Sequence, residues 1–134
     1  MNDPNLAPLL IHDKSVKLDG WDDPAKGRLQ WRTLFSKGLT QSDTITCGVA
    51  ELGPGDWLIP HRHAAAEVCY ILEGTGVLTL EGKDTPLKAG DALFIPSMAE
   101  HGSRQTGEGM FRTFYVFAVD SFEDVTYFFP EVKG

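Results

Sequence analysis

The 134-residue chain lacks several features that would point to particular classes of protein. It has two cysteines, Cys47 and Cys69, too few for a disulfide framework, so two free thiols in a reducing cytoplasm are expected. No apolar run approaches the roughly 20 residues that cross a bilayer. The start of the chain also lacks the basic and apolar regions of a signal peptide. These absences together predict a cytoplasmic protein.

Positive charge is scarce as well. Lysine and arginine number 12 against 19 aspartates and glutamates, which gives a formal net charge of −7. The basic residues form no cluster. Nucleic acids and anionic membranes are bound through clustered positive charge, so neither is expected as a partner.

Sustained helical periodicity is absent between Leu29 and Val119. Short apolar or alternating runs follow one another instead, from LQWRTLF through EVCYIL to MFRTFYVFAV, separated by Gly, Pro, Asp, Asn or Ser. Strands of this length and spacing predict an all-β sandwich or barrel, and the chain has the length of one domain. EGTGVLTLEGKDTPL predicts a tight hairpin inside it.

Composition divides the chain into three segments. Residues 1–28 are polar and interrupted by proline and glycine, which predicts an arm with little regular structure. Residues 29–119 carry the strand pattern of the barrel. Residues 120–134 form a tail with four aromatic side chains, expected to pack across the barrel or onto a partner subunit. These four are Phe122, Tyr127, Phe128 and Phe129.

A group of polar residues occurs in HRHAAAEVCYILEG, which begins at His61. Alternate strand residues share a face, so His61, His63, Glu67 and Cys69 point the same way if the register survives the three alanines. Trp57 has the same parity and is expected to wall the same pocket. Burying such polar groups unpaired is costly, and a bound metal removes that cost. Imidazole and carboxylate together suit divalent Fe, Mn, Ni, Co, Zn or Cu.

The spacing around this group is more specific than the group itself. It resembles the two motifs of the cupin superfamily in its small single-domain form. The first motif matches at Gly55, His61, His63, Glu67 and Gly74, and the second at Gly90, Pro96 and His101. The second departs at Met98, where glycine is usual, and at Gln105, where asparagine is usual. The departures concern a turn and a secondary polar position.

The resemblance implies a single-domain cupin, a jelly-roll barrel also called a double-stranded β-helix. It implies one divalent transition metal held by His61, His63, Glu67 and His101; a cupin barrel that has lost its metal is the alternative. Positions left open on the ion suit a small carboxylate or carbonyl compound. A lyase or isomerase would then act by metal-assisted proton abstraction. An iron-dependent dioxygenase and a non-catalytic small-molecule-binding or sensor protein remain open.

A narrower resemblance is to cupin-type lyases that cleave dimethylsulfoniopropionate to acrylate and dimethyl sulfide. It rests on chain length, on the HxHxxxE placement and on the ending SFEDVTYFFPEVKG. In that family a tyrosine two residues after the ligand glutamate removes the α-proton. Cys69 stands there in this chain, Tyr70 has the wrong parity, and Tyr127 matches a second family tyrosine.

Tyr127 and Cys69 are therefore the candidate catalytic residues. Each has an ordinary structural alternative: Tyr127 as one more aromatic of a packed tail, and Cys69 as a buried apolar filler. Small cupins usually pair, so the resemblance also implies a homodimer acting on a small molecule.

Overall fold

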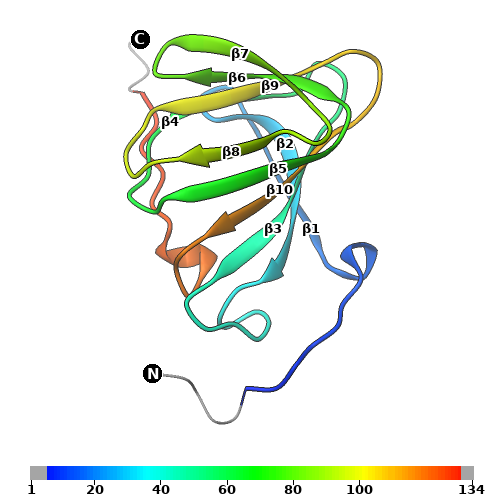
Figure 1. Cartoon of the computed structure of the whole chain (residues 1–134), viewed down its shortest axis with the longest axis vertical. Helices are drawn as coiled ribbons and strands as arrows, with labels where there is room; N and C mark the ends of the chain where they lie inside the picture. Colours follow the sequence, from blue (N-terminus) through cyan, green and yellow to red (C-terminus); the bar gives the residue numbers. More distant parts are fainter. Residues whose placement is uncertain (1–5, 131–134) are drawn as a thin grey trace.

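The computed structural model describes residues 6–130, and within them the chain is all-β (Figure 1). Two single-turn 3-10 helices, η1 (Asp13–Ser15) and η2 (Phe122–Asp124), flank the strands. In chain order the described strands are β1 (Leu18–Asp23), β2 (Gly27–Phe35), β3 (Thr46–Leu52), β4 (Trp57–His61), β5 (Glu67–Glu73), β6 (Thr75–Leu80), β7 (Lys83–Lys88), β8 (Ala92–Ile95), β9 (His101–Thr106) and β10 (Phe111–Phe117). Among the described residues, no helix is long and apolar enough to cross a membrane.

The strands pair in one curled sheet of order β7-β6-β9-β4-β2-β3-β10-β5-β8, with β1 added beside β2. Every neighbouring pair is antiparallel. Figure 1 shows the sheet curling around an interior, which confirms the predicted all-β jelly-roll barrel. The predicted hairpin is β6–β7. Glu81 and Gly82 form its turn with φ of 48° and 78°, the two positive values that a type I′ turn requires.

Strand β5 follows the alternation read from the sequence. Cys69 and Ile71 are buried, whereas Val68, Tyr70 and Leu72 are 43–48% exposed. The inner face therefore carries the residues of one parity, as predicted. Six buried apolar side chains fill the interior away from the histidines, and they are called the apolar core below. They are Leu29, Leu52, Ile71, Leu78, Leu87 and Phe111.

The predicted arm contains more regular structure than expected. Strand β1, within residues 1–28, pairs with β2 along its whole length. The sequence pattern missed it because Trp21 is its only aromatic side chain and aspartates surround it. Trp21 points inward and packs edge-on against Trp31, with ring centroids 5.0 Å apart. Residues 1–5 of the predicted arm and 131–134 of the predicted tail lie outside the described residues.

Two arginines fasten the arm to the sheet. Arg112 of β10 donates to Asp13 Oδ2 over 2.6 Å, and this hydrogen bond lowers the pKa of the Asp13 carboxyl. Arg32 of β2 donates to the carbonyl of Val16 and to Glu51. Residues 13–16 of the arm thus lie against the outer side of the β2–β3–β10 region, whereas Trp21 further along the arm points into the interior.

Candidate metal centre

Three imidazoles meet inside the barrel. His61 ends β4 and His101 begins β9, and the register of these strands pairs the two residues directly. His63 follows β4 in the connection to β5. Their ring nitrogens lie within 4.8 Å of one another, and the three residues are only 1–5% exposed. Such a cluster of buried nitrogens could hold a metal ion.

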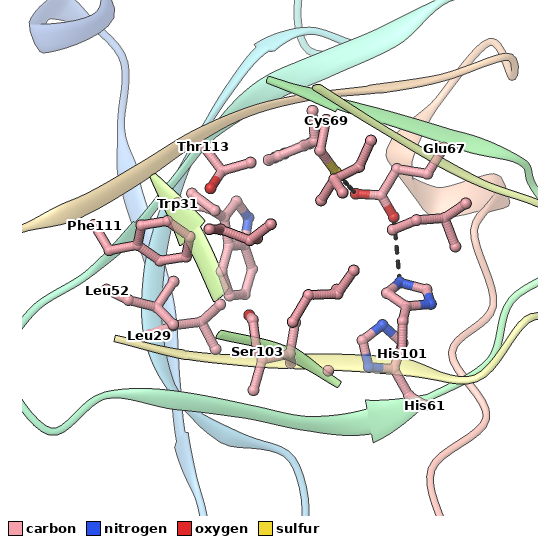
Figure 2. Close-up of a pocket in the computed structure, with 18 of the residues that line it drawn as sticks. Leu29, Trp31, Leu52, His61, Glu67, Cys69, His101, Ser103, Phe111 and Thr113 are labelled. Atoms are coloured by element: carbon pink, nitrogen blue, oxygen red, sulfur yellow. Dashed lines mark hydrogen bonds and ion pairs between the residues drawn. The ribbon is translucent and has the colours of Figure 1, made fainter. Parts of the chain in front are cut away.

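Glu67, the first residue of β5, faces this cluster. Its Oε1 lies 3.1 Å from His63 Nε2 and 3.4 Å from His101 Nε2. Figure 2 shows its carboxylate directed from the β5 side toward His101. The structure therefore brings all four predicted ligand residues together; their role as ligands stays a prediction.

The imidazoles are oriented by backbone carbonyls two residues away. The Nδ1 atoms of His61, His63 and His101 lie 2.7–2.9 Å from the carbonyl oxygens of Ile59, Ala65 and Ala99, respectively. A carbonyl only accepts, so each Nδ1 carries a hydrogen and each Nε2 is left for the centre of the cluster. Metal-binding histidines typically have this arrangement.

Burial and mutual charge shift the pKa values of these groups. Burial alone would raise the pKa of Glu67, but hydrogen bonds from His101 and His63 outweigh it and lower the pKa to about 2. Burial, reinforced by the neighbouring His101, lowers the pKa of His61 to about 4. For His101, burial is outweighed by Glu67, and the pKa is raised. The Glu67 carboxylate is thus held ionised, while the pKa of His61 is lowered and that of His101 is raised.

The donor set fits a divalent transition metal. Three buried Nε2 atoms and one carboxylate oxygen lie close together, and the outer hydrogen bonds of the imidazoles are made. Such a mixed nitrogen and oxygen set suits Fe, Mn, Ni, Zn, Co or Cu, and the metal's positive charge would neutralise Glu67. The donor set does not select one of these metals.

A cavity of about 100 Å³ begins at the cluster and extends toward the apolar core. A row of aromatic rings lines the cavity next to His61. The ring centroids of His61 and Tyr127 are 5.1 Å apart, and those of Tyr127 and Trp21 are 5.5 Å apart. Trp31 packs against Trp21 on its other side. Among the described residues lining this cavity, Glu67 is the only acidic one, and none is lysine or arginine.

Both candidate catalytic residues line this cavity. Cys69 Sγ lies 3.1 Å from Glu67 Oε2. The ring centroid of Tyr127 lies 5.4 Å from that of His63, and two backbone hydrogen bonds between Arg62 and Phe128 hold the tail there. Burial raises the pKa of Cys69 and of Tyr127 well above their ordinary values. Their catalytic roles stay predictions.

The prediction that Trp57 walls the pocket is wrong. The register between β4 and β9 shifts between Leu58 and His61, so the parity of Trp57 no longer matches that of His61. Leu58 lines the cavity, whereas Trp57 lies opposite Arg104 and contacts the Arg28 guanidinium, 5.4 Å from its ring centroid. Pro60 inside the strand is the sequence signal of such a bulge.

The two departures from the cupin motifs have structural explanations. Met98 adopts a left-handed conformation with φ of 63°, the kind that favours glycine. Its N–H donates to the His63 carbonyl, so its turn links His63 to the segment leading into β9. The Gln105 amide donates to the carbonyls of Gly107 and Gly109 and thereby closes the β9–β10 turn.

Two tryptophans of the cavity were not predicted as site residues. Trp21 lay in the segment expected to lack regular structure, and Trp31 reads as an ordinary strand aromatic. Two arginines near the proposed ligands in sequence, Arg62 and Arg104, point away from the cluster and form ion pairs on the outside of the sheet. Arg62 pairs with Glu81 and Glu100, and Arg104 pairs with Asp84 at the surface.

Residues 48–117 match the family described as the cupin domain. The chain belongs to the cupin family. This cupin is 42% identical over 122 residues to the dimethylsulfoniopropionate lyase DddW of Ruegeria pomeroyi, covering 91% of this chain and 80% of that protein. Both resemblances stated from the sequence, to the cupin superfamily and to such lyases, are confirmed.

Other relatives carry different chemistry. Over 73 residues the chain is 33% identical to the 5-nitrosalicylic acid 1,2-dioxygenase of a Bradyrhizobium species, covering 54% of this chain and 35% of that protein. The polyketide cyclase RemF of Streptomyces resistomycificus has the same fold, with a TM-score of 0.81 at 22% identity over 95% of this chain and 88% of that one. The fold alone therefore does not select a reaction.

Proposed function

We propose that this cupin is a metal-dependent lyase that cleaves dimethylsulfoniopropionate, or a closely related sulfonium carboxylate, by removing the proton next to the carboxylate. The proposed metal ligands are His61, His63, Glu67 and His101. The observation that carries the proposal is a histidine cluster suited to a metal at one end of a small cavity whose described lining residues include no lysine or arginine, in a chain 42% identical to DddW.

The charges of the cavity suit such a substrate. Among the described residues that line the cavity, none is lysine or arginine, so the metal centre is the place there that would neutralise a substrate carboxylate. A sulfonium group needs no counter-ion if it contacts aromatic faces, which attract cations. Such faces are supplied by Tyr127, which lies beside His61, and by Trp21 and Trp31, which come next in the same row of rings.

The metal, when bound, would act as a Lewis acid that holds the carboxylate and stabilises the charge formed when the α-proton leaves. Tyr127 is the proposed proton acceptor, because the Cys69 thiol is already engaged with Glu67. The charge of Glu67 contributes to the raised pKa of Tyr127, so neutralising that charge lowers it. Tyr127 first loses its hydroxyl proton to solvent, and its phenolate oxygen then takes the α-proton. The electron pair of that C–H bond forms the double bond of acrylate, and the C–S bond breaks so that dimethyl sulfide leaves with the electron pair of that bond.

The extent of the two similarities favours this reaction over an aromatic dioxygenase. The chain covers 80% of DddW at 42% identity, but only 35% of the nitrosalicylate enzyme at 33% identity. The similarity to the nitrosalicylate enzyme keeps dioxygen chemistry as the second candidate.

The test measures dimethyl sulfide and oxygen together. The protein is loaded in turn with Fe²⁺, Mn²⁺, Ni²⁺, Zn²⁺ and Co²⁺, and dimethylsulfoniopropionate is added. The proposal expects dimethyl sulfide with at least one metal, no oxygen consumption, and neither signal from a His63→Ala control. Substrate binding without product would identify a binding protein instead, and iron-dependent oxygen uptake would identify a dioxygenase.

We further propose a homodimer in the cytoplasm. The outer face of β5 and β8 exposes Val68, Tyr70, Leu72 and Phe94 by 43–66%, a contiguous apolar surface suited to a second copy. The free, buried thiols of Cys47 and Cys69 are compatible with a reducing compartment. A monomer in light scattering at micromolar concentration would contradict the dimer.

A further inference from the structure

The two oxygens of Glu67 have different partners. Oε1 faces His63 and His101, whereas Oε2 lies 3.1 Å from Cys69 Sγ. Figure 2 shows Cys69 and His101 on the two sides of the carboxylate. Oε1 is therefore turned toward the three histidines, while Oε2 contacts the Cys69 side chain on β5, the same strand that carries Glu67.

A buried glutamate does not keep this orientation unaided. Its terminal torsion has a broad energy minimum, so the carboxylate turns easily unless both oxygens have partners. A buried carboxylate oxygen left without a hydrogen-bond partner destabilises the folded protein. Among the described residues, Cys69 is the one whose side chain forms a hydrogen bond with Oε2.

The thiol is held firmly in place. Cys69 and Glu67 are two residues apart on the inner face of β5, so the strand itself sets their spacing. Leu93 of β8 and Tyr115 of β10 flank Cys69 in register, and its side chain is buried. The sulfur is thus held beside the Glu67 carboxylate.

We propose that Cys69 is a positioning residue whose S–H donates to Glu67 Oε2 and thereby holds Oε1 toward the three imidazole Nε2 atoms. This role rests on the metal site of the proposed function but on no particular reaction. It explains how the site is completed in a chain that has cysteine where the lyase resemblance expects tyrosine. It also leaves proton transfer to Tyr127.

Metal affinity without substrate tests this role. Co²⁺ is titrated into the metal-free protein against a competing chelator, and its visible absorption reports the geometry of the site. Cys69→Ala should weaken Co²⁺ binding about 10- to 100-fold, the usual effect of losing an outer hydrogen bond to a metal ligand, and should alter the spectrum. Cys69→Ser keeps a donor at the same place and should stay within about threefold of the unsubstituted protein, because its O–H replaces the S–H.

A matched control separates positioning from packing. Ile71 is the next inward residue on β5 and is 1% exposed, so Ile71→Val disturbs packing on the same strand without touching Glu67. It should lower the melting temperature and leave Co²⁺ affinity unchanged. Circular dichroism confirms that each variant is folded before titration.

Three results would overturn the role. Equal Co²⁺ affinity in Cys69→Ala and the unsubstituted protein would make Cys69 a packing residue. Thiolate-to-cobalt charge-transfer absorption that disappears in Cys69→Ser would make it a ligand. Failure of the unsubstituted protein to bind Co²⁺ would remove the site itself. A protein that binds Co²⁺ with the predicted Cys69 dependence but releases no dimethyl sulfide contradicts the proposed reaction alone.

Discussion

The two ends of the barrel interior are built on opposite principles (Figure 2). One end is the apolar core, where side chains such as Leu52 and Phe111 are about 2% exposed and each buried group stabilises the fold by about 1.5–3 kcal/mol. The other end buries three imidazoles and a carboxylate and shifts the pKa of Glu67 to about 2 and of His61 to about 4.

The difference separates stability from function. The apolar core supplies free energy of folding, whereas the polar end is a costly arrangement that the surrounding structure enforces. A bound metal ion would compensate the free-energy cost of burying the imidazoles and the carboxylate. Substitutions at the two ends should therefore affect different measurements.

The largest effect is expected in the apolar core. Phe111→Ala removes a large buried ring and should lower the free energy of unfolding by about 3–5 kcal/mol. Urea denaturation in the presence of chelator measures it. Co²⁺ affinity of the molecules that remain folded should stay unchanged; a matching loss of affinity would mean that the two ends are not separable.

The converse substitution is His63→Ala. Structural four-ligand sites bind zinc with roughly 10–16 kcal/mol, so losing one ligand should weaken binding by about 3–4 kcal/mol, or a few hundred-fold. Chelator competition measures this loss. The unfolding free energy of the metal-free variant should fall by about 1–3 kcal/mol, less than for Phe111→Ala, because the loss is that of hydrogen bonds to one buried polar side chain. A loss as large as that of Phe111→Ala would show that the two ends stabilise the fold equally.

The pH dependence of the metal-free protein comes next. The pKa of His61 is lowered from 6.5 to about 4, so its contribution to stability is complete above pH 6.5 and lost as pH falls toward 4. This loss is about 3 kcal/mol. His101 acts in the opposite sense: its raised pKa adds stability below pH 6.5 that declines as pH rises through the folded value.

His61→Gln isolates the first effect. In urea denaturation between pH 7 and pH 4.5, the variant should lose less stability on acidification than the unsubstituted protein. Glu67 contributes mainly below pH 4.5, because its pKa is lowered from 4.5 to about 2. Parallel pH profiles for the two proteins would contradict the account of His61.

The smallest effect is expected at the turn beside the metal centre. Met98 holds a left-handed conformation that costs a side-chain-bearing residue about 1–2 kcal/mol, partly offset by the entropy that glycine loses on folding. Met98→Gly should therefore stabilise the protein by about 0.5–1 kcal/mol and leave metal affinity nearly unchanged. Destabilisation would mean that the methionine side chain contributes packing to this turn.

The parts of the fold and site that follow strict local rules were predictable from the sequence. Alternation placed Glu67 and Cys69 on the inner face of β5, and the segment EGTGVLTLEGKDTPL predicted the β6–β7 hairpin. Both rest on short-range backbone geometry, which a sequence pattern expresses directly.

The remaining features depend on tertiary contacts. The register shift before His61 turned Trp57 outward, although parity alone placed it in the pocket. Strand β1 is stabilised by the packing of Trp21 on Trp31 and by the pairing of its whole backbone with β2. Neither contact produces a recognisable pattern in its sequence, LDGWDD. The hydrogen bond from Cys69 to Glu67 likewise required the side-chain geometry and not only the shared face.

The most direct measurement is elemental analysis of the protein purified without chelators, beside His63→Ala prepared in the same way. The account predicts about one equivalent of a transition metal per chain in the unsubstituted protein and almost none in the variant. No metal in either protein, and none taken up after incubation with Fe²⁺, Mn²⁺, Ni²⁺, Zn²⁺, Co²⁺ or Cu²⁺, would contradict it. The polar end would then be a metal-free binding pocket.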